Sequence, residues 1–122
     1  MAVMGEFFDL AANAERIYSE TLDISKVEPE FEKVLTLIQA HPECHVEFVD
    51  GFIEILKDAK KGPSELVSFC VHELRWNDLR SRLLEWVKTE RSERVRPVLR
   101  DVLEAFEDDW RDADMFRHFS AE

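Results

Sequence analysis

Apolar side chains recur every three or four positions along most of the chain, the period of an amphipathic α-helix. The first stripe runs through Gly5–Leu22 and places these residues near one face: Phe7, Leu10, Ala11, Ala14, Ile17 and Tyr18. We expect a break at Asp23–Lys26 and a second helix from near Pro29, because proline is favoured in a first helical turn. This helix should end at His41-Pro42, since the residue before a proline avoids the α region.

The segment Glu43–Ala59 fits two structures. It is rich in β-branched and aromatic residues, and Asp50-Gly51 is typical of a hairpin turn. Helical spacing nevertheless runs through two sets of its residues: Val46, Val49, Ile53 and Leu56, and Phe48, Phe52 and Ile55. We favour a helix that is apolar on two sides and therefore central in the fold. Gly51 inside it costs about 1 kcal/mol relative to alanine, so the hairpin stays open as the alternative.

The C-terminal half predicts three more helices and a packed tail. Lys60–Ser64 contains a lysine pair, a glycine and a proline, which indicate that one helix ends and another begins. The fourth helix then spans Ser64 to about Arg75, Asn77 caps the fifth and Ser92 caps the sixth. The stripe of the sixth helix continues through these residues: Val95, Val98, Leu99, Val102, Leu103, Phe106 and Trp110. Three residues of the tail should fold back onto the body: Met115, Phe116 and Phe119.

Together these patterns predict an all-α fold, a compact bundle of about five to six helices in a single domain over residues 1–122. With 3 Gly and 4 Pro, the chain lacks the many tight turns of an all-β protein. A weak repeat relates two groups of four residues: Leu79, Arg80, Leu83 and Trp86, and Leu99, Arg100, Leu103 and Phe106. Helix pairs of this length resemble short α-solenoid units of the HEAT kind, in which each pair packs on the next. The resemblance is architectural and implies no function.

Charge is distributed unevenly along the chain, whose net charge is −11. Residues 1–50 carry 11 acids and 3 bases, a net charge of −8. Residues 51–100 carry 8 acids and 11 bases, most of these arginines, for a net +3, and residues 101–122 carry 8 acids and 2 bases, for a net −6. The net figure therefore conceals an arginine-rich middle between two acidic ends.

Two interpretations of this charge compete. In the first, arginines of the fifth and sixth helices pair with acids of neighbouring helices, which contributes only about 0–1 kcal/mol for each exposed pair. In the second, an acidic face docks on a basic partner, since opposed surface charges steer association. The candidate partner-binding residues are Glu107, Asp108, Asp109, Trp110, Asp112 and Asp114. Trp110 and Phe116 would be its aromatic anchors, and direct nucleic-acid binding is disfavoured because phosphates would be repelled.

No pattern indicates catalysis, a metal or a cofactor. Glycine-rich phosphate loops and the G-x-S-x-G elbow are absent from the sequence. His41, Cys44, His45 and Glu47 lie close together, but their spacing matches no zinc motif, so we assign them a structural role. Cys44 and Cys70 both lie in apolar stretches and are expected to be buried thiols. No apolar run approaches the length of a membrane helix and Met1–Glu6 lacks the features of a secretory signal, so a cytoplasmic location is the default.

The sequence thus favours a non-enzymatic protein-binding module. Its sharpest form is an acidic inhibitor of a basic partner, comparable to immunity proteins and antitoxins, an analogy of size and charge only. One alternative is a helical structural or assembly subunit, a homodimer formed through exposed aromatic residues: Phe7, Phe8, Trp76 and Trp110. A small metal-dependent enzyme is the least favoured alternative.

Overall fold

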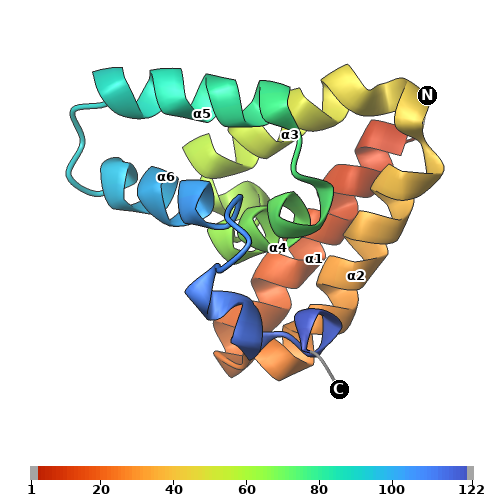
Figure 1. Ribbon diagram of the computed structural model, residues 1–122. Coiled ribbons are helices and arrows are strands. Elements are labelled where there is room, and N and C mark those ends of the chain that lie inside the picture. Colours follow the sequence, from red (N-terminus) through yellow and green to blue (C-terminus); the bar gives the residue numbers. More distant parts are fainter. Residues whose placement is uncertain (1–2, 121–122) are drawn as a thin grey trace.

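The computed structural model describes residues 3–120 and contains six α-helices and no strand within that range (Figure 1). The helices are α1 (Val3–Thr21), α2 (Ile24–Ala40), α3 (His45–Lys57), α4 (Ser64–Leu74), α5 (Asn77–Thr89) and α6 (Val95–Glu104). Four short 3₁₀ helices complete the chain: η1 (Pro42–Cys44), η2 (Ala59–Lys61), η3 (Arg111–Met115) and η4 (Arg117–Phe119). The all-α prediction is confirmed, and Asp50-Gly51 lies within α3 instead of in a hairpin turn.

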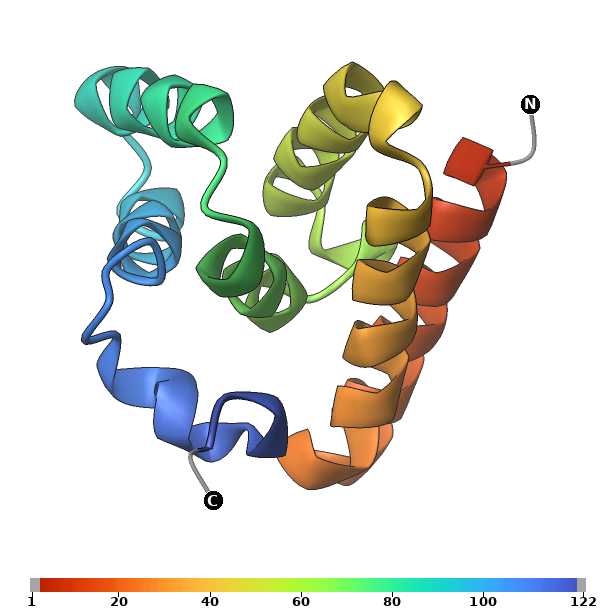
Figure 2. The ribbon, with the colours of Figure 1, turned by 45° about the vertical axis from the view of Figure 1, so that its right-hand side comes forward.

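Successive helices form three pairs, α1 with α2, α3 with α4 and α5 with α6, and the pairs contact one another through the second helix of each pair. Helices α1 and α2 run side by side, and α5 lies along α6 (Figure 1). Helix α4 contacts α2, α3 and α6, and Figure 2 shows it in the middle of the molecule, between α2 and α6. None of the helices within residues 3–120 has the length and apolar character needed to span a bilayer.

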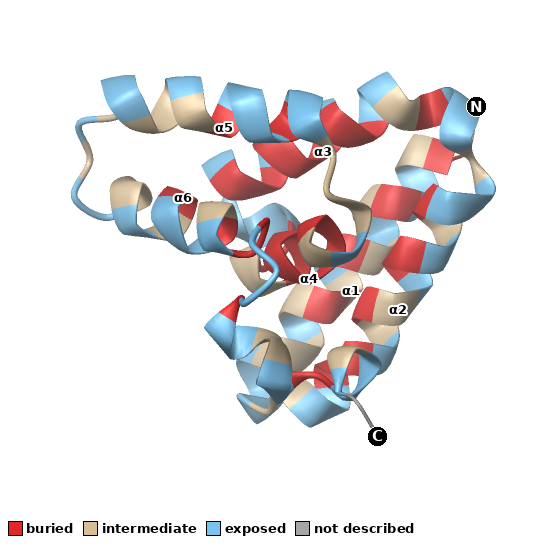
Figure 3. Ribbon diagram, in the orientation of Figure 1, coloured by how far each residue is buried: buried red, intermediate tan, exposed pale blue. Residues whose placement is uncertain are grey.

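The hydrophobic core is centred on α4. Buried positions follow one another along this helix, whereas the outer helices bury only one side (Figure 3). Its Phe69 ring lies 5.6 Å from that of Phe31 on α2 and 5.0 Å from that of Phe116 in the tail. A second aromatic group joins α1 to α3, with the Phe7 ring 5.5 Å from Phe48 and 5.6 Å from Phe52.

Gly51 explains why α3 accepts a residue of poor helix propensity. A Cβ atom at this position would lie 2.7 Å from Cε2 of Phe7 and 3.2 Å from Cε of Met4. Phe7 is fully buried, so it cannot move aside into solvent. Glycine therefore lets α3 approach α1 closely, and the packing gained there offsets the helix propensity lost.

Helix α2 begins at Ile24, five residues before the start predicted at Pro29. The Asp23 side chain accepts a hydrogen bond of 2.9 Å from the Ser25 backbone N–H, which caps the helix in front of the proline. Pro29 withholds the N–H that would bond the Ser25 carbonyl, but both residues are exposed and water can reach that carbonyl. The prediction was wrong because an early cap outweighed the preference of proline for the first turn.

The other helix boundaries agree with the sequence in part. Ser92 was predicted to cap α6, but the N-cap residue is Arg94, whose side chain makes no cap hydrogen bond; the Ser92 hydroxyl lies two residues earlier and accepts from the backbone N–H groups of Arg94 and Val95 at 3.2 Å each. Asn77 is instead the first residue of α5, whose N-cap position makes no side-chain hydrogen bond. Helix α6 ends at Glu104, so Trp110 belongs to the tail and not to the helix.

Candidate functional site

The segment that follows α6 carries most of the predicted partner-binding residues and folds back across the molecule. It passes from the end of α6 through η3 and η4 to the N-terminal half of α2 (Figures 1 and 2). Phe116 is 1% exposed and its ring lies 6.1 Å from that of Phe31 on α2. The predicted tucking of the tail is therefore confirmed for Phe116, whereas Met115 is 49% exposed and Phe119 is half-buried.

Trp110 is a core residue, which corrects its predicted role as an exposed aromatic anchor. It is 8% exposed. Its ring stacks at 6.0 Å on Phe116 and lies 5.0 Å from the His72 ring of α4. An aromatic side chain in an acidic segment is thus explained by folding, because Trp110 fastens the segment to the core instead of projecting into solvent.

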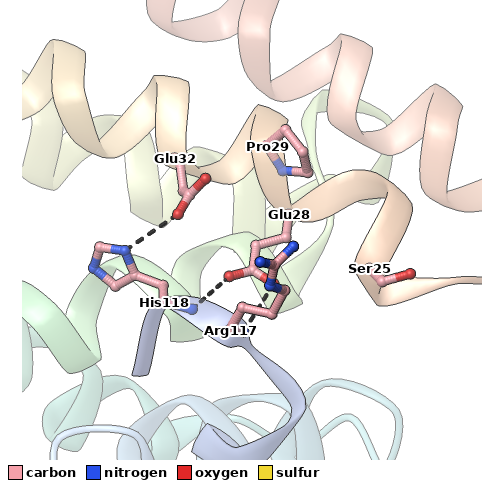
Figure 4. A pocket seen from close by; sticks show the side chains of 6 residues that line it. All are labelled: Ser25, Glu28, Pro29, Glu32, Arg117 and His118. Carbon is pink, nitrogen blue, oxygen red and sulfur yellow. Dashed lines mark hydrogen bonds and ion pairs between the residues drawn. The ribbon is translucent and has the colours of Figure 1, made fainter. Parts of the chain in front are cut away.

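A buried carboxylate fastens the end of the same segment to α2. Figure 4 shows Glu28 pointing from α2 towards η4, where its two oxygens accept from the backbone N–H groups of Arg117 (3.1 Å) and His118 (2.8 Å). Glu28 is only 4% exposed. These are the free N–H groups of the first turn of η4, so the carboxylate acts as a cap supplied by another helix.

His118 adds a second link beside this clamp. Its Nδ1 lies 3.3 Å from Glu32 of α2 and its Nε2 lies 3.2 Å from Glu73 of α4. Two carboxylates can only accept, so both bonds form together when the imidazole is protonated and donates from each nitrogen. In the pocket of Figure 4, lined by Ser25, Glu28, Pro29, Glu32, Arg117 and His118, the polar side chains are already engaged in structure except that of Arg117, which makes no hydrogen bond or ion pair within residues 3–120.

Two of the predicted acids are neutralised within the fold. Asp108 lies 2.7 Å from the Arg75 guanidinium, and Glu107 lies 3.9 Å from that of Arg80. The hydrogen bond from Arg75, followed by its charge, lowers the pKa of Asp108. For these residues the interpretation of internal charge pairing applies.

Three of the predicted acids remain free. Asp109, Asp112 and Asp114 are exposed and form no ion pair with any residue in the described range 3–120. Asp101 on α6 is also exposed and lines the same pocket as Asp112. Arg111 is the one base between Asp109 and Asp112, and it is exposed as well. A net negative surface is therefore held in a fixed position by Trp110 and the Glu28 clamp.

In the arginine-rich middle of the chain, too, some charged side chains form ion pairs within the fold and others do not. Arg82 pairs with Asp50 of α3 at 2.7 Å, which ties α5 to α3. Arg91 and Arg94 are exposed on the loop between α5 and α6, and within residues 3–120 neither makes an ion pair. In Figure 1 this loop lies at the left edge, away from η3 and η4, so these two bases lie apart from the free acids, whereas Arg111 lies among them.

The thiols and histidines serve the structure. Cys44 and Cys70 are both free and buried, and burial raises the pKa of the Cys70 thiol far above its usual range. His41 bonds Glu43 at 3.0 Å, and His45 bonds Asp78 of α5 at 2.7 Å. In the described part of the chain, no group of three or more His, Cys, Asp or Glu side chains is arranged so that it could hold a metal ion.

The aromatic stripe considered for a homodimer is not present on the surface. Phe7 and Trp110 are buried, while Phe8 and Trp76 are half-buried against the core. The large hydrophobic residues that are exposed within residues 3–120 lie in three separate parts of the chain: Leu22, Val46 and Met115. Single exposed apolar residues of this kind are normal on a monomer.

Comparison with protein-family models, curated proteins and solved structures finds no match to this chain. Its function is therefore argued from the residues of the acidic segment and their surroundings.

Proposed function

We propose that this chain is a non-enzymatic protein-binding module whose acidic C-terminal face docks on a basic surface of another protein. The face comprises Asp101 and the acids of the segment from Glu107 to Asp114. One observation carries the proposal: Asp109, Asp112 and Asp114 are exposed and without an ion-pair partner in residues 3–120, on a segment fastened to the core at both ends.

Rigid placement is what makes these carboxylates suited to recognition. A mobile acidic tail would lose conformational freedom on binding, at a cost of about 1–2 kcal/mol for each ordered residue. Here Trp110 and the Glu28 clamp have already ordered the segment during folding, so docking incurs less of that cost. Fixed charges also orient an approaching partner before contact, which raises the association rate.

In its most specific form, the proposal is that this chain inhibits a basic protein, in the way that immunity proteins and antitoxins inhibit their partners. A negative face that covers a basic groove would exclude phosphate-bearing ligands from it. The net charge of −11 supports a protein partner over a nucleic acid. A cytoplasmic location is part of the proposal, supported by two free cysteines, which persist in reducing compartments.

The test compares capture by three versions of the full chain. The face variant carries Asp109→Lys, Asp112→Lys and Asp114→Lys. The control carries Glu6→Lys, Asp9→Lys and Glu47→Lys, which reverse three exposed acids of α1 and α3 and change the net charge equally. Each protein, checked for its fold by circular dichroism, is immobilised and exposed to extract of the source cells, and bound proteins are identified.

We expect a protein of basic surface on the wild-type chain and on the control, and its loss from the face variant. Capture by the face variant as strong as that by the wild type would refute docking through this face. A partner lost equally from the control would indicate a response to net charge alone, which also contradicts the proposal.

A further inference from the structure

We propose that a basic pocket between α3 and α5 binds a small aromatic carboxylate, a planar ring that bears one carboxylate group. Four residues line this pocket: Ile53 and Lys57 of α3, and Arg82 and Trp86 of α5. Each helix contributes two residues that are four positions apart and therefore lie on the same face. In Figure 1 α3 and α5 lie at the top and the acidic segment lies below them, so this site goes beyond the proposed docking face.

The lining is positively charged in a protein whose net charge is −11. Lys57 and Arg82 contribute two cations, and no acidic residue of the described chain lines the pocket. Lys57 forms no ion pair within residues 3–120, and its Nζ lies 5.8 Å from the centre of the Trp86 ring. A cation–π contact gives the ammonium no anionic partner, so Lys57 remains available to an anion.

Arg82 is held in place and still has donors for a ligand. One terminal nitrogen of its guanidinium donates to Asp50 of α3 at 2.7 Å, and the side chain makes no other hydrogen bond within residues 3–120. A guanidinium carries five N–H donors, so most of them remain free. The bond to Asp50 fixes the guanidinium beside the pocket, and its planar fork matches the two oxygens of a carboxylate.

The indole of Trp86 is held in a similar way. Its Nε1–H donates to one oxygen of Glu90 at 2.8 Å, and the other oxygen accepts from the backbone N–H of Ser92 at 3.0 Å. The hydrogen bond from Ser92, followed by that from Trp86, lowers the pKa of Glu90, so this carboxylate stays charged and keeps its hold on the ring. The half-buried ring and the buried Ile53 therefore form an ordered apolar wall beside the two cations, a combination typical of ligand sites.

The size of the pocket and the charges around it select the kind of anion. The cavity measures about 200 Å³, the space of about seven waters at about 30 Å³ each, whereas pockets for drug-sized ligands measure about 300–1,000 Å³. It therefore suits one ring with its acid group and is too small for a nucleotide. The carboxylates of Asp50 and Glu90 bond the lining from outside, so they would repel a doubly charged phosphate more strongly than a singly charged carboxylate.

These contacts define the position of the ligand. Its carboxylate lies between Lys57 and Arg82, and its ring packs on the indole of Trp86. Lys57 is exposed and has a flexible four-carbon stem, so its ammonium can move from the indole to the carboxylate while the ring of the ligand takes its place. The exchange replaces one cation–π contact by an ion pair and an aromatic contact.

The inference is tested by NMR titration of the isotope-labelled full chain with sodium benzoate. Benzamide is the matched uncharged probe, since it keeps the ring and replaces the carboxylate by an amide. The pocket variant is Lys57→Gln with Arg82→Gln. The control variant, Lys26→Gln with Arg91→Gln, removes the same charge at two exposed positions outside the lining. Lys57→Gln alone breaks no ion pair, so it takes over the test if circular dichroism shows that the double variant does not fold.

We expect benzoate to shift the indole N–H signal of Trp86 and the methyl signals of Ile53 at about millimolar concentration, and benzamide to leave them unchanged. The pocket variant should weaken binding about tenfold or more and Lys57→Gln alone about threefold or more, whereas the control should change it by less than about twofold. Equal shifts with both probes, shifts that map outside α3 and α5, or equal losses in the pocket and control variants would overturn the inference.

Two further probes test the class of anion. Cyclohexanecarboxylate keeps the charge but has no aromatic ring, and it should bind about twofold to tenfold more weakly than benzoate; equal or tighter binding would refute the contact with the indole. Phenyl phosphate should also bind more weakly, and tighter binding would refute the choice of a carboxylate and indicate a phosphate ester. The face and control variants of the capture experiment leave the four lining residues unchanged, so failure of one experiment is distinguishable from failure of the other.

Discussion

Replacing Gly51 by alanine tests the packing that brings α3 against α1. The new Cβ would stand 2.7 Å from Cε2 of Phe7, a ring enclosed by Phe8, Phe48 and Phe52. Overpacking of this kind costs about 1–3 kcal/mol, and the better helix propensity of alanine returns about 1 kcal/mol. We therefore expect Gly51→Ala to lower the free energy of unfolding by about 1 kcal/mol.

Gly5→Ala provides the matched control. Gly5 is also helical, but nothing lies within 4 Å of the position of an added Cβ atom. This variant should gain up to about 1 kcal/mol, so urea denaturation should separate the two variants by about 2 kcal/mol.

A double-mutant cycle then identifies the cause of the loss. Shortening the opposing ring by Phe7→Leu should make room, so Gly51→Ala should cost less in that background than in the wild type. A penalty that Phe7→Leu leaves unchanged, or a gain from Gly51→Ala equal to that from Gly5→Ala, would refute the close approach of the two helices.

Three further predictions concern the tail and its charges. Glu28→Gln should cost about 1–3 kcal/mol of stability and speed amide exchange at the N–H groups of Arg117 and His118; unchanged exchange would contradict the clamp. Trp110→Ala should cost about 3–5 kcal/mol and Asp109→Asn under about 0.5 kcal/mol in the same urea assay, and similar losses would contradict their opposite burial. Hydrogen bonding by Arg75 keeps the pKa of Asp108 below its unfolded value of about 4, so its contribution is complete above that pH and vanishes as the pH falls through the folded value. The urea midpoint of Asp108→Asn should therefore fall less than that of the wild type between about pH 7 and pH 3, and equal falls would contradict this.

The helices could be predicted from the sequence because their apolar period is local information. The start of α2 was predicted wrongly, because the cap formed by Asp23 competes with the preference of Pro29 for a first helical turn. The sequence alone does not decide between these two signals. In the sequence, Gly51 counted against a helix because glycine has a low helix propensity. In the structure it is what lets α3 pack closely on Phe7, and this close approach cannot be inferred from the spacing of residues alone.

The acidic segment shows that the sequence gives the composition of a candidate functional site but not the contacts of its individual residues. Its composition indicated a negative face, but not that Asp108 is neutralised by Arg75 while Asp112 remains free. Trp110 was assigned to the surface because its neighbours are charged, whereas the backbone turns it towards His72 and the core.

The central claim is most directly tested by the salt dependence of association with the captured partner, once it is purified. Between about 0.01 M and about 1 M salt the Debye length falls from about 30 Å to about 3 Å, which removes long-range attraction. We predict that the association rate of the wild-type chain falls by at least about tenfold over this range, and that Asp109→Asn, Asp112→Asn and Asp114→Asn together abolish most of that dependence. An association rate that does not respond to salt, or that responds equally in this variant, would contradict docking through the acidic face.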